Sequence, residues 1–437
     1  MGSKKVADKS SRREVLKTAG LALTGAGLAT FMGPWKHLRV YAQAQDKPLK
    51  IGLTHDATGQ FGASGQSERR GTMMAIDEFN EKGGVLGREI TTVWQDTETT
   101  PATGSRVAER FITSEECAFI VGAVQSGVAN AISQACQKYG VVYFNTNSSS
   151  TTESGKDCHR TKFMWDGNAD NFAQASVKGS IEKFGPKWVL LTNDYVWGHD
   201  SSAATRKTLA KHGGEVIEEI LVPVGTRDFS TILLTVQQLK PDCVAPAVGG
   251  DDFKALRTQV LGLGLDKKIA FSSGAVPDWP DIWGLGHDAV FGVFPTTWYH
   301  YLELPDVPEF VARYRNQSPD APSPVPGNVF YNGYYAMREL LRTIEQVGST
   351  NNIKIIKALE GHRMSARDRM QHHDAWINPA THHVEQTVYT CSANSEPRDD
   401  TDYFKVVDVS KPDDVTSTAS DAECKLETYE ATPTYEL

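Results

Sequence analysis

The chain has 437 residues, of which 40% are hydrophobic and 23% charged, and this apolar content excludes a disordered or collagen-like protein. Its length predicts two or three domains. The first 44 residues carry 8 Lys and Arg against 2 Asp and Glu, so the 393 residues that follow carry a net charge of −15. An acidic body repels phosphate backbones, which argues against nucleic acid as a partner.

The N-terminal 44 residues have the order of an export signal. Arg12-Arg13 precedes residues 18–35, which carry no charge, and Ala42-Gln43-Ala44 offers small residues for cleavage. The paired arginines and Leu16-Lys17 resemble a twin-arginine signal, whose substrates are exported already folded. We expect a periplasmic protein that is cleaved after Ala44. A short core helix and an uncleaved anchor are the alternatives, since 18 uncharged residues barely span a bilayer.

From Leu49 onward, short apolar runs alternate with stretches of helical periodicity. Strands are predicted at residues 50–54, 90–95, 118–122 and 141–144, and helices at 66–82, 102–113 and 126–139. This alternation predicts an α/β fold with a parallel sheet and helices on both of its faces.

The alternation then restarts in a second half of similar length. Helices are predicted at residues 171–184, 200–212, 230–239 and 252–261, and strands at 188–191, 215–222, 243–245 and 268–272. Later helices are expected at 307–315, 334–347 and 353–359. Because open α/β sheets bind ligands at the carboxyl ends of their strands, two such lobes predict a hinged binder with its ligand in the cleft.

Six cysteines follow the signal, and six cysteines can pair in 15 ways. Cys391 and Cys424 flank a polar C-terminal stretch and are the pair that we expect. Cys117, Cys136 and Cys243 lie in apolar or helical surroundings and are expected as buried thiols. Without a CxxC spacing, the cysteines indicate neither a redox motif nor a zinc site.

Other motifs give no support for catalysis or for a cofactor. His372-His373 and His382-His383 lack a metal-ligand spacing, so we expect solvated or hydrogen-bonded histidines. Gly262-Leu263-Gly264 follows a helix, whereas a dinucleotide-binding motif follows a strand. No GxSxG or Walker sequence is present. The sequence therefore predicts a protein without enzymatic activity, cofactor or metal.

Several motifs, taken in order, carry a resemblance to a known family. They are Thr58-Gly59-Gln60-Phe61-Gly62, Gly83-Gly84-Val85-Leu86-Gly87-Arg88 with Asp96, Val121-Gly122 with Ser126, Asp194-Tyr195-Val196-Trp197-Gly198, Asp228-Phe229-Ser230 and Gly249-Gly250. From about residue 48 to 390 the chain resembles the branched-chain amino acid (leucine/isoleucine/valine-binding) type of periplasmic solute-binding protein, which serves ABC importers.

The resemblance implies a type I periplasmic-binding fold, in which two doubly wound parallel-sheet lobes are joined by a three-crossing hinge. The crossings are expected near Trp165, Thr297 and Trp376. Lobe 1 would comprise residues 48–165 and 298–375, lobe 2 residues 166–297 and 376–390, and residues 391–437 a polar C-terminal extension.

The resemblance also implies a function and partners. We expect a monomer that captures a small-molecule ligand (an amino acid, an amide or an aromatic carboxylate) and presents it to an ABC permease of the inner membrane. A ligand-sensing subunit of a signalling system, built on the same fold, is the alternative.

Three polar residues are candidate contacts for a ligand carboxylate. Ser126 begins a helix after the strand that ends at Gly122, where a hydroxyl and free backbone amides can hold an anion, and family members use a serine there. Asn147 and Ser149 follow the next strand, although Thr146 replaces the family's customary proline. An N-cap serine and a serine-rich turn are the structural alternatives.

Four further residues are candidates for the rest of the ligand. Trp197 stands where relatives place an aromatic residue that closes over the ligand. Asp251 could accept a hydrogen bond from a ligand ammonium or, like Asp252, interact with the positive end of the helix dipole. Phe61 and Trp165, together with Trp298, are expected to line the cleft or the hinge, with core packing as the alternative.

One position departs from the family pattern. The amino acid binders of the family carry an acidic residue after a later strand, and the alignment places that position near Ala275. This departure argues against an α-amino acid ligand.

Overall fold

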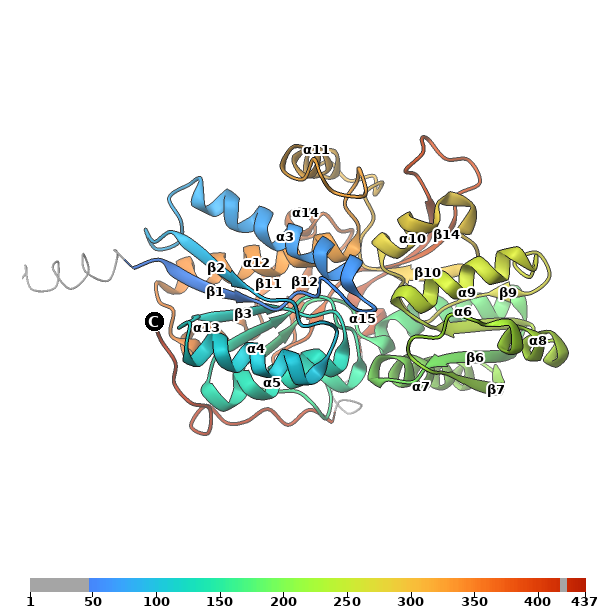
Figure 1. The fold of residues 1–437 in the computed structure, drawn as a ribbon, viewed down its shortest axis with the longest axis horizontal. Coiled ribbons are helices and arrows are strands. Elements are labelled where there is room, and N and C mark those ends of the chain that lie inside the picture. The colour runs from blue at the N-terminus through green and yellow to red at the C-terminus, as the bar shows by residue number, and fades with distance from the viewer. Residues whose placement is uncertain (1–46, 417–422) are drawn as a thin grey trace, which may run out of the picture. The chain divides into compact units, whose positions relative to one another are not determined.

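A five-stranded parallel sheet forms the centre of lobe 1 (Figure 1). The computed structural model describes residues 47–416 and 423–437, so the expected export signal, residues 1–44, lies outside the described residues. The strand order is β2-β1-β3-β4-β5. These strands are β1 (Leu49–Leu53), β2 (Ile90–Trp94), β3 (Phe119–Gly122), β4 (Val142–Asn145) and β5 (Lys162–Met164).

Helices cover both faces of this sheet, as the alternation of strands and helices predicts. α4 (Pro101–Thr113) and α5 (Ser126–Tyr139) pack together on one face, where Ile120 and Tyr143 are buried. α3 (Gly62–Asn80) and α12 (Asn328–Val347) pack together on the other face, over Val121 and Phe144. Because both faces are covered, β3 is buried along its whole length.

Lobe 2 has a second parallel sheet with the strand order β7-β6-β8-β9. Its strands are β6 (Lys187–Asn193), β7 (Glu215–Val222), β8 (Cys243–Ala247) and β9 (Ala270–Phe271). α6 (Ala169–Phe184) and α7 (Val196–Lys211) cover one face, and α8 (Ser230–Leu239) and α9 (Gly250–Gly262) cover the other. α10 (Trp279–Leu285) and the 3-10 helix η2 (His287–Ala289) contact α9.

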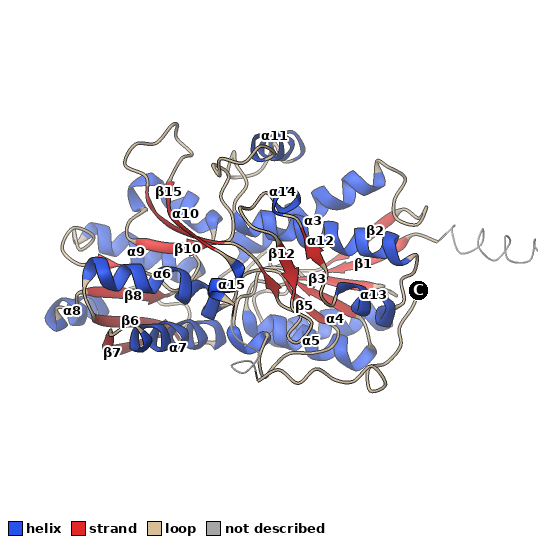
Figure 2. Cartoon of the chain, turned by 180° about the vertical axis from the view of Figure 1, so that it is seen from behind, coloured by secondary structure: helices blue, strands red, loops and turns tan. Residues whose placement is uncertain are grey.

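A separate three-stranded antiparallel sheet lies beside the second sheet (Figure 2). β10 (Val293–Thr296) is linked to the second sheet through a bridge between Ser272 and Val293. β14 (Val388–Ala393) pairs with β10, and β15 (Phe404–Ser410) pairs with β14. The short helix α15 (Pro412–Val415) packs against α6. Part of the expected C-terminal extension is therefore an integral portion of lobe 2.

The chain returns to lobe 1 between β10 and β14. This part contains α11 (Val307–Gln317), α12, α13 (Asn352–Leu359), α14 (Ala366–Arg369) and a small antiparallel sheet of β11 (Arg363–Met364), β12 (Ala375–Ile377) and β13 (Val384–Glu385). A bridge between Met164 and His383 ties the small sheet to β5.

Within residues 47–416 three connections join the lobes, and one of them lies later than predicted. Trp165 follows β5 and Thr297 follows β10, at the first two connections. Trp376, near the expected third connection, instead pairs with Arg363 and Glu385 within lobe 1. The third connection is the segment between β13 and β14, because backbone pairing to β11 keeps β12 and β13 in lobe 1.

A disulfide fixes the end of the chain to lobe 1 and corrects the expected pairing. Cys424 is bonded to Cys158, and Cys391 is a buried free thiol, as are Cys117, Cys136 and Cys243. The expected Cys391–Cys424 pair is wrong because Cys391 lies inside β14 of lobe 2, opposite Phe294.

Residues 423–437 make further contacts with lobe 1 after this bond. Tyr435 Oη donates to the carbonyl oxygen of Cys117 at 2.9 Å, and Asn352 Nδ2 donates to that of Pro433 at 2.8 Å. The segment therefore packs on lobe 1, whereas the sequence predicts that it belongs to a separate polar extension.

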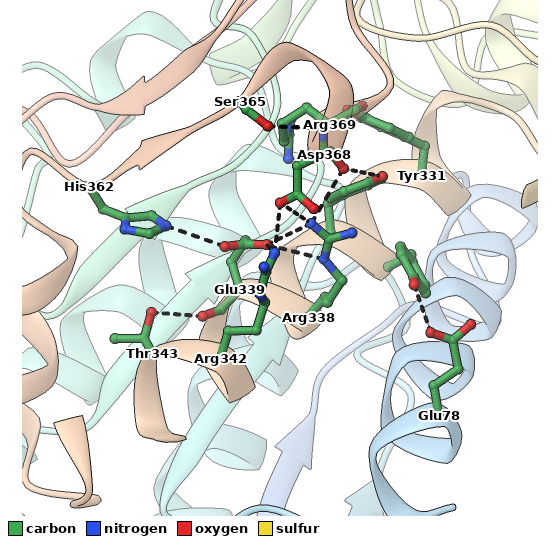
Figure 3. Close-up of polar contacts among 12 residues, drawn as sticks. Glu78, Tyr331, Arg338, Glu339, Arg342, Thr343, His362, Ser365, Asp368 and Arg369 are labelled. Carbon is green, nitrogen blue, oxygen red and sulfur yellow. Dashed lines mark hydrogen bonds and ion pairs between the residues drawn. The ribbon is translucent and has the colours of Figure 1, made fainter. Parts of the chain in front are cut away.

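A network of charges anchors α12 to α14 (Figure 3). The buried carboxylate of Glu339 accepts hydrogen bonds from Arg338 at 3.0 Å and from Arg342 at 3.1 Å, and His362 Nε2 lies 3.3 Å away. Arg342 also binds the carboxylate of Asp368 at 2.6 Å. The buried carboxylate of Glu339 and the more exposed one of Asp368 are thus both paired with arginines.

Candidate ligand-binding site

A pocket lies where the carboxyl ends of strands from both sheets meet. It encloses about 400 Å³ of atom-free space, part of which is open solvent. Lobe 1 contributes the loops after β1, β3 and β4, and lobe 2 those after β6, β8 and β9. The lining residues are Phe61, Val124, Asn147, Ser149, Tyr195, Trp197, Val248, Gly249, Gly250, Phe253, Val276, Pro277, Asp278 and Asp281.

Phe61 reaches the pocket because an aspartate from the next strand fixes its loop. Asp96, which follows β2, accepts hydrogen bonds from the backbone N–H of Ala57 at 2.8 Å and from Thr58 Oγ1 at 2.6 Å. Gln60 Nε2 in the same loop donates to the carbonyl oxygen of Gly249 in lobe 2, at 2.9 Å. The loop therefore holds Phe61 against lobe 2.

Trp197 joins the two lobes through a buried hydrogen bond. Its Nε1–H donates to Ser149 Oγ of lobe 1 at 2.9 Å. Its ring stacks on Tyr195, with centroids 5.9 Å apart, and Tyr195 in turn lies 6.1 Å from Phe61. Gly198 allows α7 to start here, since a Cβ at this position would lie 2.0 Å from the carbonyl oxygen of Asn193.

Two aspartates that sequence analysis does not identify line the pocket. Asn147 Nδ2 donates to Asp278 Oδ1 at 3.4 Å, and Lys254 Nζ lies 3.5 Å from Asp281 Oδ1. Burial raises the pKa of Asp278 to about 6. Burial and the charge of Asp278 raise the pKa of Asp281 to about 7, against the opposing effect of Lys254.

Asp278 lies three residues after Ala275, the position near which the family alignment places an acidic residue. The local sequence Asp278-Trp279-Pro280-Asp281 is typical of a helix start, and α10 indeed begins at Trp279. That pattern predicts a capping residue, so within the sequence only the nearby acidic position of the family indicates a ligand contact for Asp278.

Ser126 lies beside the pocket but outside its lining. It is fully buried, and its Oγ lies 2.8 Å from Ser148 Oγ and 2.7 Å from Ser150 Oγ. The N-cap of α5 is Gln125, whose side chain accepts from the backbone N–H of Val128 at 2.8 Å. The structure therefore gives Ser126 neither the capping role nor an open path to the pocket.

Asp251 and Trp165 also lie outside the lining. Asp251 is paired with Lys254 Nζ at 2.6 Å and with Arg227 at 3.1 Å, so its charge is balanced within lobe 2. Trp165 is fully buried at the first connection, with its ring 5.3 Å from Phe144 and 5.7 Å from the guanidinium of Arg369.

Among the residues that the structure describes, no group of three or more His, Cys, Asp or Glu could hold a metal ion. His382 stacks on Phe163 with centroids 4.4 Å apart, and its Nε2 lies 3.0 Å from Glu360 Oε1. His383 Nε2 lies 2.8 Å from the carbonyl oxygen of Asp166. The buried histidine pair thus has structural hydrogen bonds. None of the helices within residues 47–416 and 423–437 has the length and apolarity needed to span a bilayer.

The fold and the pocket define a two-lobed α/β binding protein. A family model described as periplasmic binding protein matches residues 48–398, and the chain therefore belongs to this family.

Named relatives match most of the chain. It is similar to the Leu/Ile/Val-binding protein BraC3 of Rhizobium johnstonii, with 26% identity over 319 residues that cover 72% of this chain and 84% of the relative. It is also similar to the Leu/Ile/Val-binding protein homolog 2 of Brucella abortus, with 24% identity over 313 residues that cover 71% and 82%.

Solved structures match the fold. A periplasmic binding protein from Burkholderia mallei superimposes with a TM-score of 0.79 at 21% identity, covering 86% of this chain and 98% of that one. A solute-binding protein of an ABC transporter from Rhodopseudomonas palustris, in complex with benzoate, has a TM-score of 0.76 at 20% identity, covering 87% and 100%. At these identities the likeness shows a shared fold.

Proposed function

We propose that this protein is a receptor that binds a small organic solute between its lobes and delivers it to an ABC importer of the inner membrane. The observation that carries the proposal is the pocket that both lobes build, closed by the hydrogen bond from Trp197 to Ser149. A solute that contacts both lobes favours the closed arrangement by as much as it binds that arrangement more tightly than the open one.

The relatives support transport and indicate which ligands to test. Two carry the name Leu/Ile/Val-binding protein, and one structural neighbour holds benzoate. Amino acids and aromatic acids are therefore candidate classes, together with the amides that the sequence leaves open. These names favour a transport receptor over a ligand-sensing subunit.

Export and assembly are part of the same proposal. The family description supports a periplasmic location, and we propose that a twin-arginine signal directs export and is cleaved after Ala44. The receptor would act as a monomer, without a cofactor and without catalysis, and its partners would be the solute and the permease. Of the candidate contacts, Phe61, Asn147, Ser149 and Trp197 line the pocket and are the ones that we propose to touch the ligand.

A thermal-shift screen of the mature chain tests the proposed function. A ligand at about 100 times its dissociation constant adds about 2.7 kcal/mol to the free energy of unfolding, which raises the unfolding midpoint by several degrees. We expect an amino acid, an amide, an aromatic acid or an organic amine to give this shift in the wild type and not in Trp197→Ala. An absence of any shift, or an equal shift in Trp197→Ala, would contradict the proposal.

A further inference from the structure

A carboxylate of the protein is bound beside Ser126, where the sequence predicts that a ligand carboxylate binds. Glu153, which ends the 3-10 helix η1 (Thr151–Glu153), accepts hydrogen bonds from Ser148 Oγ and from Asn145 Nδ2, the latter at 2.6 Å. Ser126 Oγ contacts Ser148 Oγ. Lys162 Nζ, also buried, lies 3.9 Å from Glu153 Oε2. A ligand carboxylate would compete with Glu153 for these donors and this cation.

Asp278 lines the pocket without a cation beside it. It precedes α10, but its carboxylate makes no capping hydrogen bond to that helix. No described Lys, Arg or His forms an ion pair with it, and its neighbour Asn147 is neutral. Asp281 differs, because Lys254 balances its charge. Since a carboxylate facing a pocket without a counter-charge is costly, a cation from the ligand would complete the site.

The surroundings of Asp278 oppose a further negative charge. Glu68 of α3 is fully buried, and neither of its carboxylate oxygens has a partner among the described residues. Burial and then the charges of Asp56, Asp278 and Asp166 raise the pKa of Glu68 well above its usual value. The carboxylate of Asp278 itself would repel an anionic ligand at this wall of the pocket, whereas it would attract a cation.

Aromatic rings supply the remaining walls. Phe61, Tyr195, Trp197 and Phe253 line the same pocket as Asp278. The faces of such rings attract cations through their quadrupoles. Trp197 donates its only N–H group to Ser149, so it presents its ring to a ligand and no free donor.

We infer that the solute is a small organic cation without a carboxylate, held by Asp278 and by the aromatic walls of Phe61, Tyr195 and Trp197. This inference rests on the proposed function and specifies its ligand. It replaces the carboxylate ligand that the sequence positions of Ser126 and Ser149 predict.

Calorimetric titration with a matched series of probes tests the inference on the mature wild-type protein. Isopentylammonium, leucine and 4-methylpentanoate share one side chain and differ in charged groups, and benzylammonium and benzoate form an aromatic pair. We expect at least one of the two ammonium probes to bind tenfold or more tightly than its matched carboxylate, and isopentylammonium to bind more tightly than leucine. Tighter binding of leucine, 4-methylpentanoate or benzoate would overturn the inference and leave the proposed function standing.

A charge variant gives a second readout at the same site. Asp278→Asn should lower the affinity for the ammonium probes at least tenfold, whereas Asp288→Asn, at a fully exposed position in η2, should leave it unchanged. Equal affinities in wild type and a folded Asp278→Asn would overturn the role of Asp278. Failure of every probe to bind the wild type overturns the inference, and a thermal-shift screen without any hit would then remove the proposed function as well.

Discussion

Glu153 is a buried carboxylate whose protonation is linked to the stability of the fold. Burial raises the pKa of Glu153 to about 7, against the opposing effects of Lys162 and the Ser148 hydroxyl. The folded protein therefore keeps a proton that the unfolded chain has released above its ordinary pKa of 4.5. Since the folded state binds more protons in this interval, the contribution of Glu153 to stability falls as the pH rises from about 4.5 to 7.

Glu153→Gln should remove this pH dependence, because glutamine keeps the shape and does not titrate. We expect the free energy of unfolding of the wild type to fall more steeply with rising pH than that of the variant, by up to about 1.4 kcal/mol per pH unit in this interval. Urea denaturation at a series of pH values measures this pH dependence of the free energy of unfolding. Glu182→Gln, on the exposed side of α6, should keep the wild-type slope. An identical slope in Glu153→Gln would show that the residue is not linked to folding.

At the scale of elements, α12 depends on its charge network as well as on its apolar face. Burial opposes the charged form of Glu339, but His362, Arg338 and Arg342 outweigh it and lower the pKa of Glu339 to about 2. The stabilisation from this group is therefore present above pH 4.5 and is lost as the pH falls towards 2.

Glu339→Gln should destabilise the protein by about 2 kcal/mol at neutral pH, because Arg338 and Arg342 lose the buried one of the two carboxylates that they share. Denaturant unfolding measures this loss, and the difference from the wild type should shrink as the pH falls below 4.5. Glu345→Gln, at an exposed position of the same helix, is the matched control. A loss in Glu345→Gln as large as that in Glu339→Gln would contradict the network's role.

The elements that sequence predicts well are those with a strong periodic signal. Strands such as β3 are continuous apolar runs, because helices cover both faces of the sheet. β12, β13 and β15 are short or polar, so backbone pairing with neighbouring strands and not a periodic pattern decides their place. The third connection and the role of the C-terminal segment were therefore beyond pattern analysis.

The residues of the site likewise divide into those that the sequence predicts and those that depend on tertiary structure. The order of family motifs leads to Phe61, Asn147, Ser149 and Trp197, and the structure brings these four residues together. It does not lead to Asp278, because a helix-start pattern explains that residue without a ligand. Nor can spacing reveal that Glu153 would reach the hydroxyl of Ser148, since that contact depends on the tertiary course of the loop.

At the scale of the whole molecule, the Cys158–Cys424 bond closes a loop of most of the chain. The two cysteines are 266 residues apart. Such a bond stabilises mainly by restricting the unfolded chain. We expect Cys424→Ser to lower the free energy of unfolding by about 2–5 kcal/mol, measured by denaturant titration. A reducing agent should lower the midpoint of the wild type and not that of Cys424→Ser. Equal stability of the two proteins without reductant would contradict this account.

The central claim is that one solute is held by both lobes at once. Calorimetry with the ligand that the screen identifies tests it most directly, on wild type, Phe61→Ala in lobe 1 and Trp197→Ala in lobe 2. We predict one site per chain in the wild type and at least a tenfold loss of affinity in each variant. Full affinity in either folded variant would place the ligand on one lobe or elsewhere, and would contradict the claim.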